Sequence, residues 1–144
     1  VIELDNTLVD DFGNNLRPGA KKFLISLRKS GHVLILWTNS LRPRAEDILK
    51  QHDLAKFFSK VLAREDYDPL GSDGLKDIRK VNGQVLVDDN PAQQKFGKKY
   101  GYAVFTVNPF TTFRKVEADE LEQVFVKIQK LGSAGSRLKK LFGF

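Results

Sequence analysis

The sequence has no cysteine and no methionine among its 144 residues, and it has only two histidines. The absence of cysteine excludes disulfides, thiolate zinc sites and cysteine nucleophiles. Two histidines argue against a metal site built on several imidazoles. A long hydrophobic run is also missing, because the longest strongly apolar stretch, residues 33–37, is far short of the roughly 20 residues that a membrane span needs. With no signal-peptide pattern either, we expect a soluble intracellular domain without membrane contact.

Acidic charge is scarce in one part of the chain only. Residues 1–94 carry 14 Lys and Arg against 14 Asp and Glu, whereas residues 95–144 carry 10 against 4. The net charge of +6 therefore comes entirely from the last third, which favours an anionic partner on that side. The hydrophobic fraction of 41% and the eleven phenylalanines are enough for a buried core, and the length is typical of one domain.

Short apolar runs alternate with helical patterns along the chain. We predict strands over 1–4, 32–37, 59–63, 84–87 and 102–107, and helices over 20–29, 43–51, 75–81, 91–99 and 118–131. The continuous apolar runs are typical of strands buried on both faces. The alternation predicts an α/β fold, with a Rossmann-like parallel sheet flanked by helices. Loops rich in Asp, Asn, Gly and Pro are expected at 9–18 and 64–74.

The end of the chain differs from the rest in composition. Residues 132–136 are Gly, Ser and Ala, which is typical of a flexible linker, and a basic and apolar tail follows. We therefore predict a domain over 1–131 and a flexible segment over 132–144. The tail resembles a tethered docking peptide, and a disordered end is the alternative.

Polar residues stand where three of the predicted strands end. They are Glu3 and Asp5, Thr38 and Asn39, and Asp88 and Asp89. The carboxyl ends of parallel strands meet at one edge of a sheet, so we expect these groups to converge. Four carboxylates would repel one another unless a hard cation joined them, which predicts a Mg²⁺ site. A lysine, Lys76 or Lys80, would make the same edge suitable for a phosphate group. The alternative is that these residues only cap helices and turns.

Four short segments resemble the motifs of the haloacid dehalogenase (HAD) superfamily. They are Leu4–Leu8, Trp37–Ser40, Lys76–Ile78 and Val87–Pro91. The branch that they resemble most is that of small CTD-phosphatase, or NLI-interacting-factor-like, domains, and Arg17-Pro18-Gly19 supports this choice. The resemblance implies a Rossmann-like HAD core and a Mg²⁺-dependent phosphatase that works through an aspartyl-phosphate.

The resemblance also implies a role for each residue. Glu3 stands where the family motif has its nucleophilic Asp, and Asp5 matches the general acid/base. Thr38, Asn39 and Lys76 match phosphate-binding residues, and the metal ligands would be Glu3, Asp5, Asp88 and Asp89. The additional methylene of Glu3 would displace the attacking oxygen by roughly 1 Å, and a misplacement of that size can lower a rate about 10²-fold.

The loops between the motifs are too short to form a cap domain over the site. An open cleft favours a macromolecular phosphate ester, such as a phosphoprotein segment, over a small metabolite. We therefore predict a phosphatase that hydrolyses such phosphomonoesters. The alternative is a catalytically inactive HAD-fold scaffold that binds RNA, a ribonucleoprotein or an acidic protein through Lys95, Lys98, Lys99 and the C-terminal region.

Overall fold

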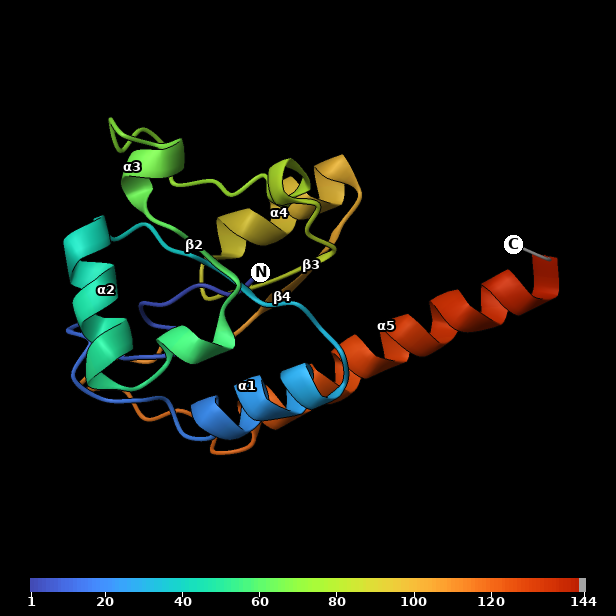
Figure 1. Cartoon of the computed structure of the whole chain (residues 1–144), viewed down its shortest axis with the longest axis horizontal. Helices are drawn as coiled ribbons and strands as arrows, with labels where there is room; N and C mark the ends of the chain where they lie inside the picture. Colours follow the sequence, from blue (N-terminus) through green and yellow to red (C-terminus); the bar gives the residue numbers. More distant parts are fainter. Residues whose placement is uncertain (143–144) are drawn as a thin grey trace.

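In a computed structural model of the chain, strands and helices alternate along the sequence (Figure 1). The structure describes the backbone of residues 1–142 and the side chains of residues 1–134. Its regular strands are β1 (Ile35–Trp37), β2 (Lys60–Leu62), β3 (Val85–Asp88) and β4 (Ala103–Thr106). Strand β1 pairs with β2 and strand β3 pairs with β4, and both pairs are parallel.

The first residues of the chain join the two pairs of strands into one sheet. Ile2 forms parallel bridges to Leu36 in β1 and to Val87 in β3. Its amide donates to the carbonyl of Ile35 at 2.9 Å, and the amide of Glu3 donates to Val87 at 3.0 Å. The resulting order is β2, β1, residues 1–4, β3, β4, which is the doubly wound arrangement. Residues 1–4 therefore lie at the centre of the sheet, and Glu3 lies near its carboxyl edge.

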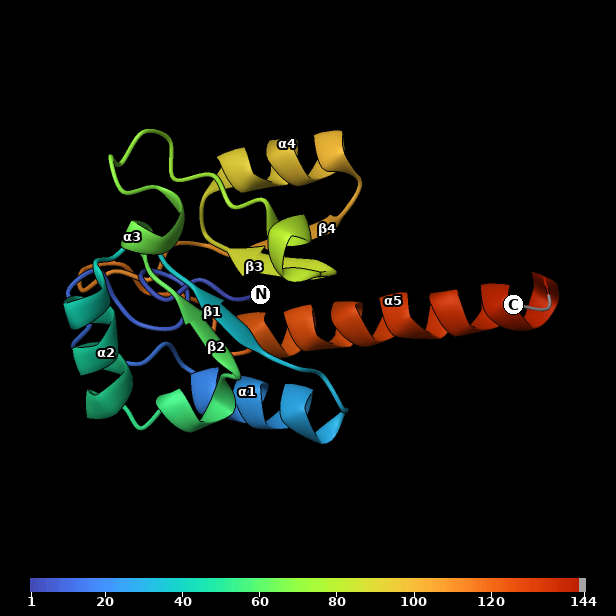
Figure 2. The same cartoon turned by 45° about the horizontal axis from the view of Figure 1, so that its top comes forward.

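Helices cover both faces of this sheet. They are α1 (Ala20–Lys29), α2 (Arg42–Gln51), α3 (Arg64–Tyr67), α4 (Pro91–Tyr100) and α5 (Glu120–Phe142), with short 3₁₀ turns η1 (Ala55–Phe57) and η2 (Ile78–Val81). Figure 2 shows α4 on one side of the strands and α1 beside α5 on the other. Helix α4 begins at a proline, and the side chain of Asn90 accepts a hydrogen bond from the amide of Ala92 at 3.0 Å. It ends at Gly101, whose φ of 81° suits glycine.

The core fills the space between the sheet and the helices. Leu4 from the central segment, Leu36 from β1 and Val87 from β3 are buried in one cluster with side chains of α1 and α5. Leu121, Val124 and Ile128 supply the buried face of α5, at the spacing expected of an amphipathic helix. Burial of each such side chain contributes about 1.5–3 kcal/mol, which holds the strand ends in register. No helix within residues 1–142 combines the length and the apolar character that crossing a bilayer requires.

The structure differs from the predicted elements in three segments before the last helix. Residues 1–4, expected as a strand, form only isolated bridges, although they lie within the sheet. The expected loop at 64–74 contains α3, which forms because the carboxylate of Asp66 accepts a hydrogen bond from the amide of Ala63 at 2.8 Å. The expected helix at 75–81 is only η2, because the backbone around Lys76 is extended toward the sheet edge and the amide of Lys76 bonds to Gln93.

Helix α5 also extends beyond its predicted end. It continues through residues 132–136, where composition predicts a flexible linker, and it runs out past the body of the protein (Figure 1). Gly132 lies in the helix, although a glycine there costs about 1 kcal/mol relative to alanine. Ser133 does not break it, because its hydroxyl donates to the carbonyl of Gln129 at 3.1 Å. The division into a domain over 1–131 and a separate segment over 132–144 stays a prediction, and residues 143–144 lie outside the described residues.

Candidate active site

Three charged side chains form a buried cluster at the carboxyl edge of the sheet. Glu3 comes from the central segment, Asp88 from the end of β3, and Lys76 from the segment before η2. The Nζ atom of Lys76 donates to Oδ2 of Asp88 at 2.6 Å and forms an ion pair with the carboxylate of Glu3. Glu3 is only 4% exposed, and Lys76 and Asp88 are each 1% exposed. Two buried carboxylates thus share one ammonium group.

Burial and the neighbouring charges together determine the protonation of this cluster. Burial raises the pKa of Glu3 to about 7; the Lys76 ammonium opposes this rise, and the Asp88 carboxylate adds to it. Burial alone would lower the pKa of Lys76, but the two carboxylates beside it raise that pKa, so Lys76 stays a cation. Burial and the charge of Asp88 also raise the pKa of Asp89. The cluster therefore holds a proton on Glu3 up to near neutral pH.

A frame of hydrogen bonds positions Lys76. Gln93 is buried in α4, and its side-chain oxygen accepts from the amide of Lys76 at 3.0 Å, while its nitrogen donates to the carbonyl of Gly74 at 2.9 Å. The hydroxyl of Tyr102 donates to the carbonyl of Lys76 at 2.8 Å. Lys80 is exposed on η2. Of the two candidate lysines, the structure thus places Lys76 beside the carboxylates.

Asp5 belongs to a second group of contacts, next to the cluster. Its Oδ2 atom accepts from the hydroxyl of Ser40 at 2.6 Å and from that of Thr38 at 3.3 Å. Its Oδ1 atom forms an ion pair with Nη1 of Arg44, at 2.5 Å. Both oxygens of Asp5 are therefore engaged by side chains that follow β1.

Two other predicted residues lie at the rim of the site. Asn39 is exposed, and its side-chain oxygen accepts from the hydroxyl of Tyr67. Burial raises the pKa of that hydroxyl to about 12, and the ring of Tyr67 packs edge-on against Trp37 with centroids 5.1 Å apart. Asp89 is half-buried and accepts from the hydroxyl of Thr7 at 3.3 Å. All seven predicted residues thus come to the same edge, but as separate contact groups.

Arg17 holds the turn that carries Asp5 and Thr7. Its guanidinium is buried and donates to the carbonyl of Thr7 at 2.5 Å and to that of Asn6 at 2.8 Å. It also donates to the carbonyl of Asn108 and forms an ion pair with Glu120, at the start of α5, at 2.8 Å. One buried side chain thus ties the first motif to the final helix.

Sequence reasoning did not place four of these side chains in the site. They are Arg17, Arg44, Tyr67 and Gln93. Arg17 had a signal, since it precedes a Pro-Gly pair that resembles a family motif. The other three lie in helices, where an arginine, a tyrosine or a glutamine is ordinary.

The carboxylates do not form a ready metal centre. Within residues 1–134, whose side chains are described, no three His, Asp or Glu side chains are grouped as a metal site would require. Instead, Lys76 engages Glu3 and Asp88, and Arg44 engages Asp5. Oxygen donors of the type that Mg²⁺ prefers are present, but they are held by these contacts.

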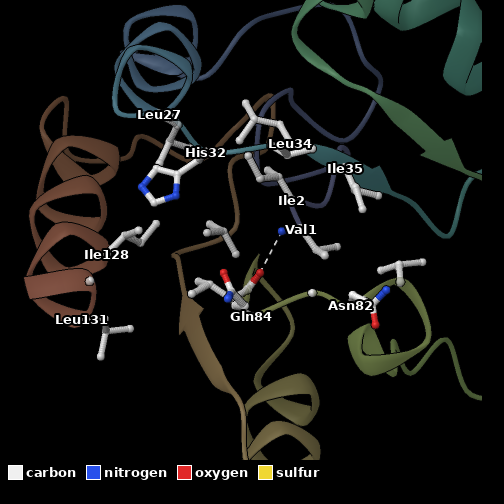
Figure 3. Close-up of a pocket in the computed structure, with 17 residues that line it drawn as sticks. Val1, Ile2, Leu27, His32, Leu34, Ile35, Asn82, Gln84, Ile128 and Leu131 are labelled. Carbon is white, nitrogen blue, oxygen red and sulfur yellow. Dashed lines mark hydrogen bonds between the residues drawn. The ribbon is translucent and has the colours of Figure 1, made fainter. Parts of the chain in front are cut away.

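A hollow of about 620 Å³ lies at the opposite edge of the sheet (Figure 3). Val1, Leu34 and Ile128 contribute apolar surface to it, and the N-terminal amino group of Val1 donates to the carbonyl of Val85 at 2.8 Å. None of the predicted site residues is among those that line it. The hollow therefore lies apart from the charged residues that converge at the carboxyl edge.

A family model for NLI interacting factor-like phosphatases matches residues 1–136. The chain belongs to this family. This confirms the resemblance seen in the motifs and places the NLI interacting factor-like domain in the HAD superfamily, whose phosphatases typically use Mg²⁺. The α/β architecture expected from the sequence is also confirmed, and no cap domain is evident within residues 1–142.

Curated and solved relatives of this NLI interacting factor-like domain support the same fold. A phosphoglycolate phosphatase of Vibrio cholerae serotype O1 is 28% identical over 105 residues, which cover 62% of this chain and 46% of the relative. The structure of a Pnkp1/Rnl/Hen1 complex matches with a TM-score of 0.59 and 18% identity, over 78% of this chain and 46% of the matched chain. The crystal structure of a predicted phosphoglycolate phosphatase from Haemophilus somnus 129pt matches with a TM-score of 0.52 and 17% identity, over 82% and 57%. The chain thus spans about half the length of these relatives, and the solved structures share its fold.

Proposed function

We propose that this domain hydrolyses phosphomonoesters with the help of Mg²⁺, on a macromolecular substrate such as a phosphoprotein segment. The observation that carries the proposal is the buried cluster of Glu3, Lys76 and Asp88 at the carboxyl edge of the sheet, with Asp5 and Thr38 beside it. Within a phosphatase family, this arrangement joins an acceptor carboxylate, a cation and hydrogen-bond donors in one place.

Each side chain has a role in this proposal. Glu3 is the carboxylate that accepts the phosphoryl group, and Asp5 donates a proton to the leaving-group oxygen and later activates water. Thr38, Asn39 and Lys76 hold the phosphoryl oxygens. The position of Lys76 next to Glu3 supports its part, because one ammonium group can neutralise both the acceptor and the incoming phosphate.

Magnesium would be held by carboxylates of the same edge. Their donor type fits a hard cation, and Asp88 and Asp89 follow one another at the end of β3. Asp5 and Glu3 were also predicted as ligands, and Asp5 would first have to leave Arg44. When bound, the ion would offset the negative charge of the phosphoryl oxygens.

An uncovered site supports a large substrate. The segments that could close over it are short: residues 9–18 contain no regular helix, and the connection from β2 to β3 contains only the four-residue α3 and the 3₁₀ turn η2. A phosphorylated segment of a protein could therefore reach the carboxyl edge without the opening of a lid.

The test is release of the nitrophenolate from p-nitrophenyl phosphate with Mg²⁺. The unmodified chain is compared with Glu3→Asp and Asp5→Asn, and the exposed Asp47→Asn in α2 serves as the matched control. We expect slow turnover by the unmodified chain, about 10²-fold faster turnover by Glu3→Asp, and none by Asp5→Asn. Turnover by neither the unmodified chain nor Glu3→Asp would refute the proposal.

One observation favours a second candidate, an inactive domain kept as a binding module. The raised pKa of Glu3, about 7, leaves much of the acceptor protonated at neutral pH, and its side chain is longer than the Asp of the family motif. Binding would then rest on the exposed Lys95, Lys98 and Lys99 of α4. In the same helix, the ring of Tyr100 carries a further cation, because the guanidinium carbon of Arg79 lies 4.2 Å from its centroid.

This second candidate predicts salt-dependent binding of RNA or of an acidic protein. Neutralisation of Lys95, Lys98 and Lys99 together should weaken the binding of an RNA probe. It should also reduce the slope of the logarithm of affinity against the logarithm of salt concentration by about three. Binding that does not respond to salt would exclude this candidate. Phosphatase turnover measured on the same samples separates the two candidates.

A further inference from the structure

Arg44 is the cation at the mouth of the site. It lies in the first turn of α2, and its side chain is 39% exposed. One guanidinium nitrogen contacts Asp5 and the hydroxyl of Ser40, each at 2.5 Å, and the other donates to the carbonyl of Asp11 at 3.1 Å. Arg44 therefore bridges the proposed acid/base and the loop that follows the first motif.

This contact is incompatible with the proposed work of Asp5. To donate a proton to the leaving group, Asp5 needs an oxygen that faces the substrate, but Ser40 and Thr38 engage Oδ2 and Arg44 engages Oδ1. Arg44 is the partner that can leave, because it is partly exposed and partly exposed ion pairs are weak.

The place of Arg44 also determines which part of a substrate it meets. In the proposed reaction, Asp5 protonates the leaving group. Its partly exposed partner Arg44 would then lie beside the body of the substrate rather than beside the transferred phosphoryl group. Lys76 is enclosed by Glu3 and Asp88, and cannot turn toward that part of the substrate. A guanidinium at this position suits a carboxylate, which it can bind through two parallel hydrogen bonds.

We infer that Arg44 is a specificity-determining residue that selects phosphoprotein segments with an acidic side chain next to the phosphorylated residue. The acidic group competes with Asp5 for Arg44, so the acid/base is free for a larger share of the time when such a substrate is bound than when Arg44 has no other partner. This inference rests on the proposed phosphatase function and names its substrate class.

The test compares two labelled phosphoserine peptides that differ only in Asp or Asn beside the phosphoserine. Their dissociation constants are measured by fluorescence anisotropy for the unmodified chain, Arg44→Gln and Arg42→Gln. Arg42 is the matched control, because it lies in the same helix with 38% exposure but pairs with Glu46 and Asp66, away from Asp5. Turnover of the peptides and of p-nitrophenyl phosphate is measured in the unmodified chain and in the Glu3→Asp background.

We expect the unmodified chain and Arg42→Gln to bind the Asp peptide about tenfold more tightly than the Asn peptide, and Arg44→Gln to bind both equally. On p-nitrophenyl phosphate, which has no acidic neighbour, Arg44→Gln should raise kcat because Asp5 is free. A purely structural role would instead lower kcat on every substrate.

Equal binding of the two peptides by the unmodified chain, a preference that survives in Arg44→Gln, or no peptide binding at all would each overturn the role of Arg44. Selective binding without turnover in either background would refute the phosphatase function and leave the recognition role of Arg44 supported. The two failures are therefore distinguishable.

Discussion

Replacing Glu3 with glutamine should make the protein more stable at alkaline pH than the unmodified chain. Glutamine has nearly the same shape as glutamate, and it leaves Lys76 paired with Asp88 alone, so that the buried charges balance. In the unmodified chain, by contrast, ionisation of Glu3 creates a second buried anion beside a single ammonium group.

The magnitude follows from the pKa of Glu3. Folding raises this pKa from 4.5 to about 7, so between these values the native state binds more protons than the unfolded state. Stability conferred by the proton is then present at low pH and is lost as the pH rises from about 4.5 through about 7. The shift corresponds to roughly 3 kcal/mol of unfolding free energy. Because glutamine does not titrate, the stability of Glu3→Gln relative to the unmodified chain should increase by that amount between pH 4.5 and pH 8.

The assay is urea unfolding at several pH values, in buffers with a chelator so that no divalent cation compensates the carboxylates. Trp37, the single tryptophan, is buried beside Tyr67 and reports unfolding through its fluorescence. The control is Glu122→Gln, whose carboxylate is 59% exposed and whose effect should not vary with pH. A difference between Glu3→Gln and the unmodified chain that stays constant, or that shrinks as pH rises, would refute the reasoning.

Three further predictions concern the groups that hold the site together. Lys76→Met should destabilise the protein by about 3–5 kcal/mol at pH 8 and by less at pH 5, because it leaves two buried carboxylates without a cation. Urea unfolding at the two pH values measures both losses of stability, and equal losses would contradict the prediction. Arg17→Met should cost about 3–5 kcal/mol in the same assay, since it strands the carboxylate of Glu120 and three backbone carbonyls, and a loss under 1 kcal/mol would show that water replaces the guanidinium. Gly97→Ala should lower stability by about 1–3 kcal/mol in thermal unfolding, because a Cβ there would overlap a methyl carbon of Val104. An unchanged melting temperature would mean that α4 can move away from β4 without loss of stability.

Local patterns predicted the helices and strands well where the chain also packs regularly. Helix α1 begins and ends at the predicted residues, and α4 begins at the predicted Pro91, because proline, glycine and apolar spacing act within a few residues. The prediction failed for η2, because the backbone around Lys76 follows hydrogen bonds to Gln93 and Tyr102 rather than its own helical propensity. Long-range contacts of this kind leave no trace in the pattern of a short segment.

The sequence by itself determined the family, the order of the motifs and the sheet edge at which they meet, since strand ends and turn residues are local signals and parallel strands share one direction. Only the tertiary structure decided how the side chains pair there. Lys76 rather than Lys80 reaches Glu3 and Asp88, and Arg44 takes Asp5, although these partners are 12 to 73 positions apart in the chain. The physical reason is that an ion pair depends on a few ångströms of side-chain placement and on burial, and both are fixed only when the sheet and its helices have packed together.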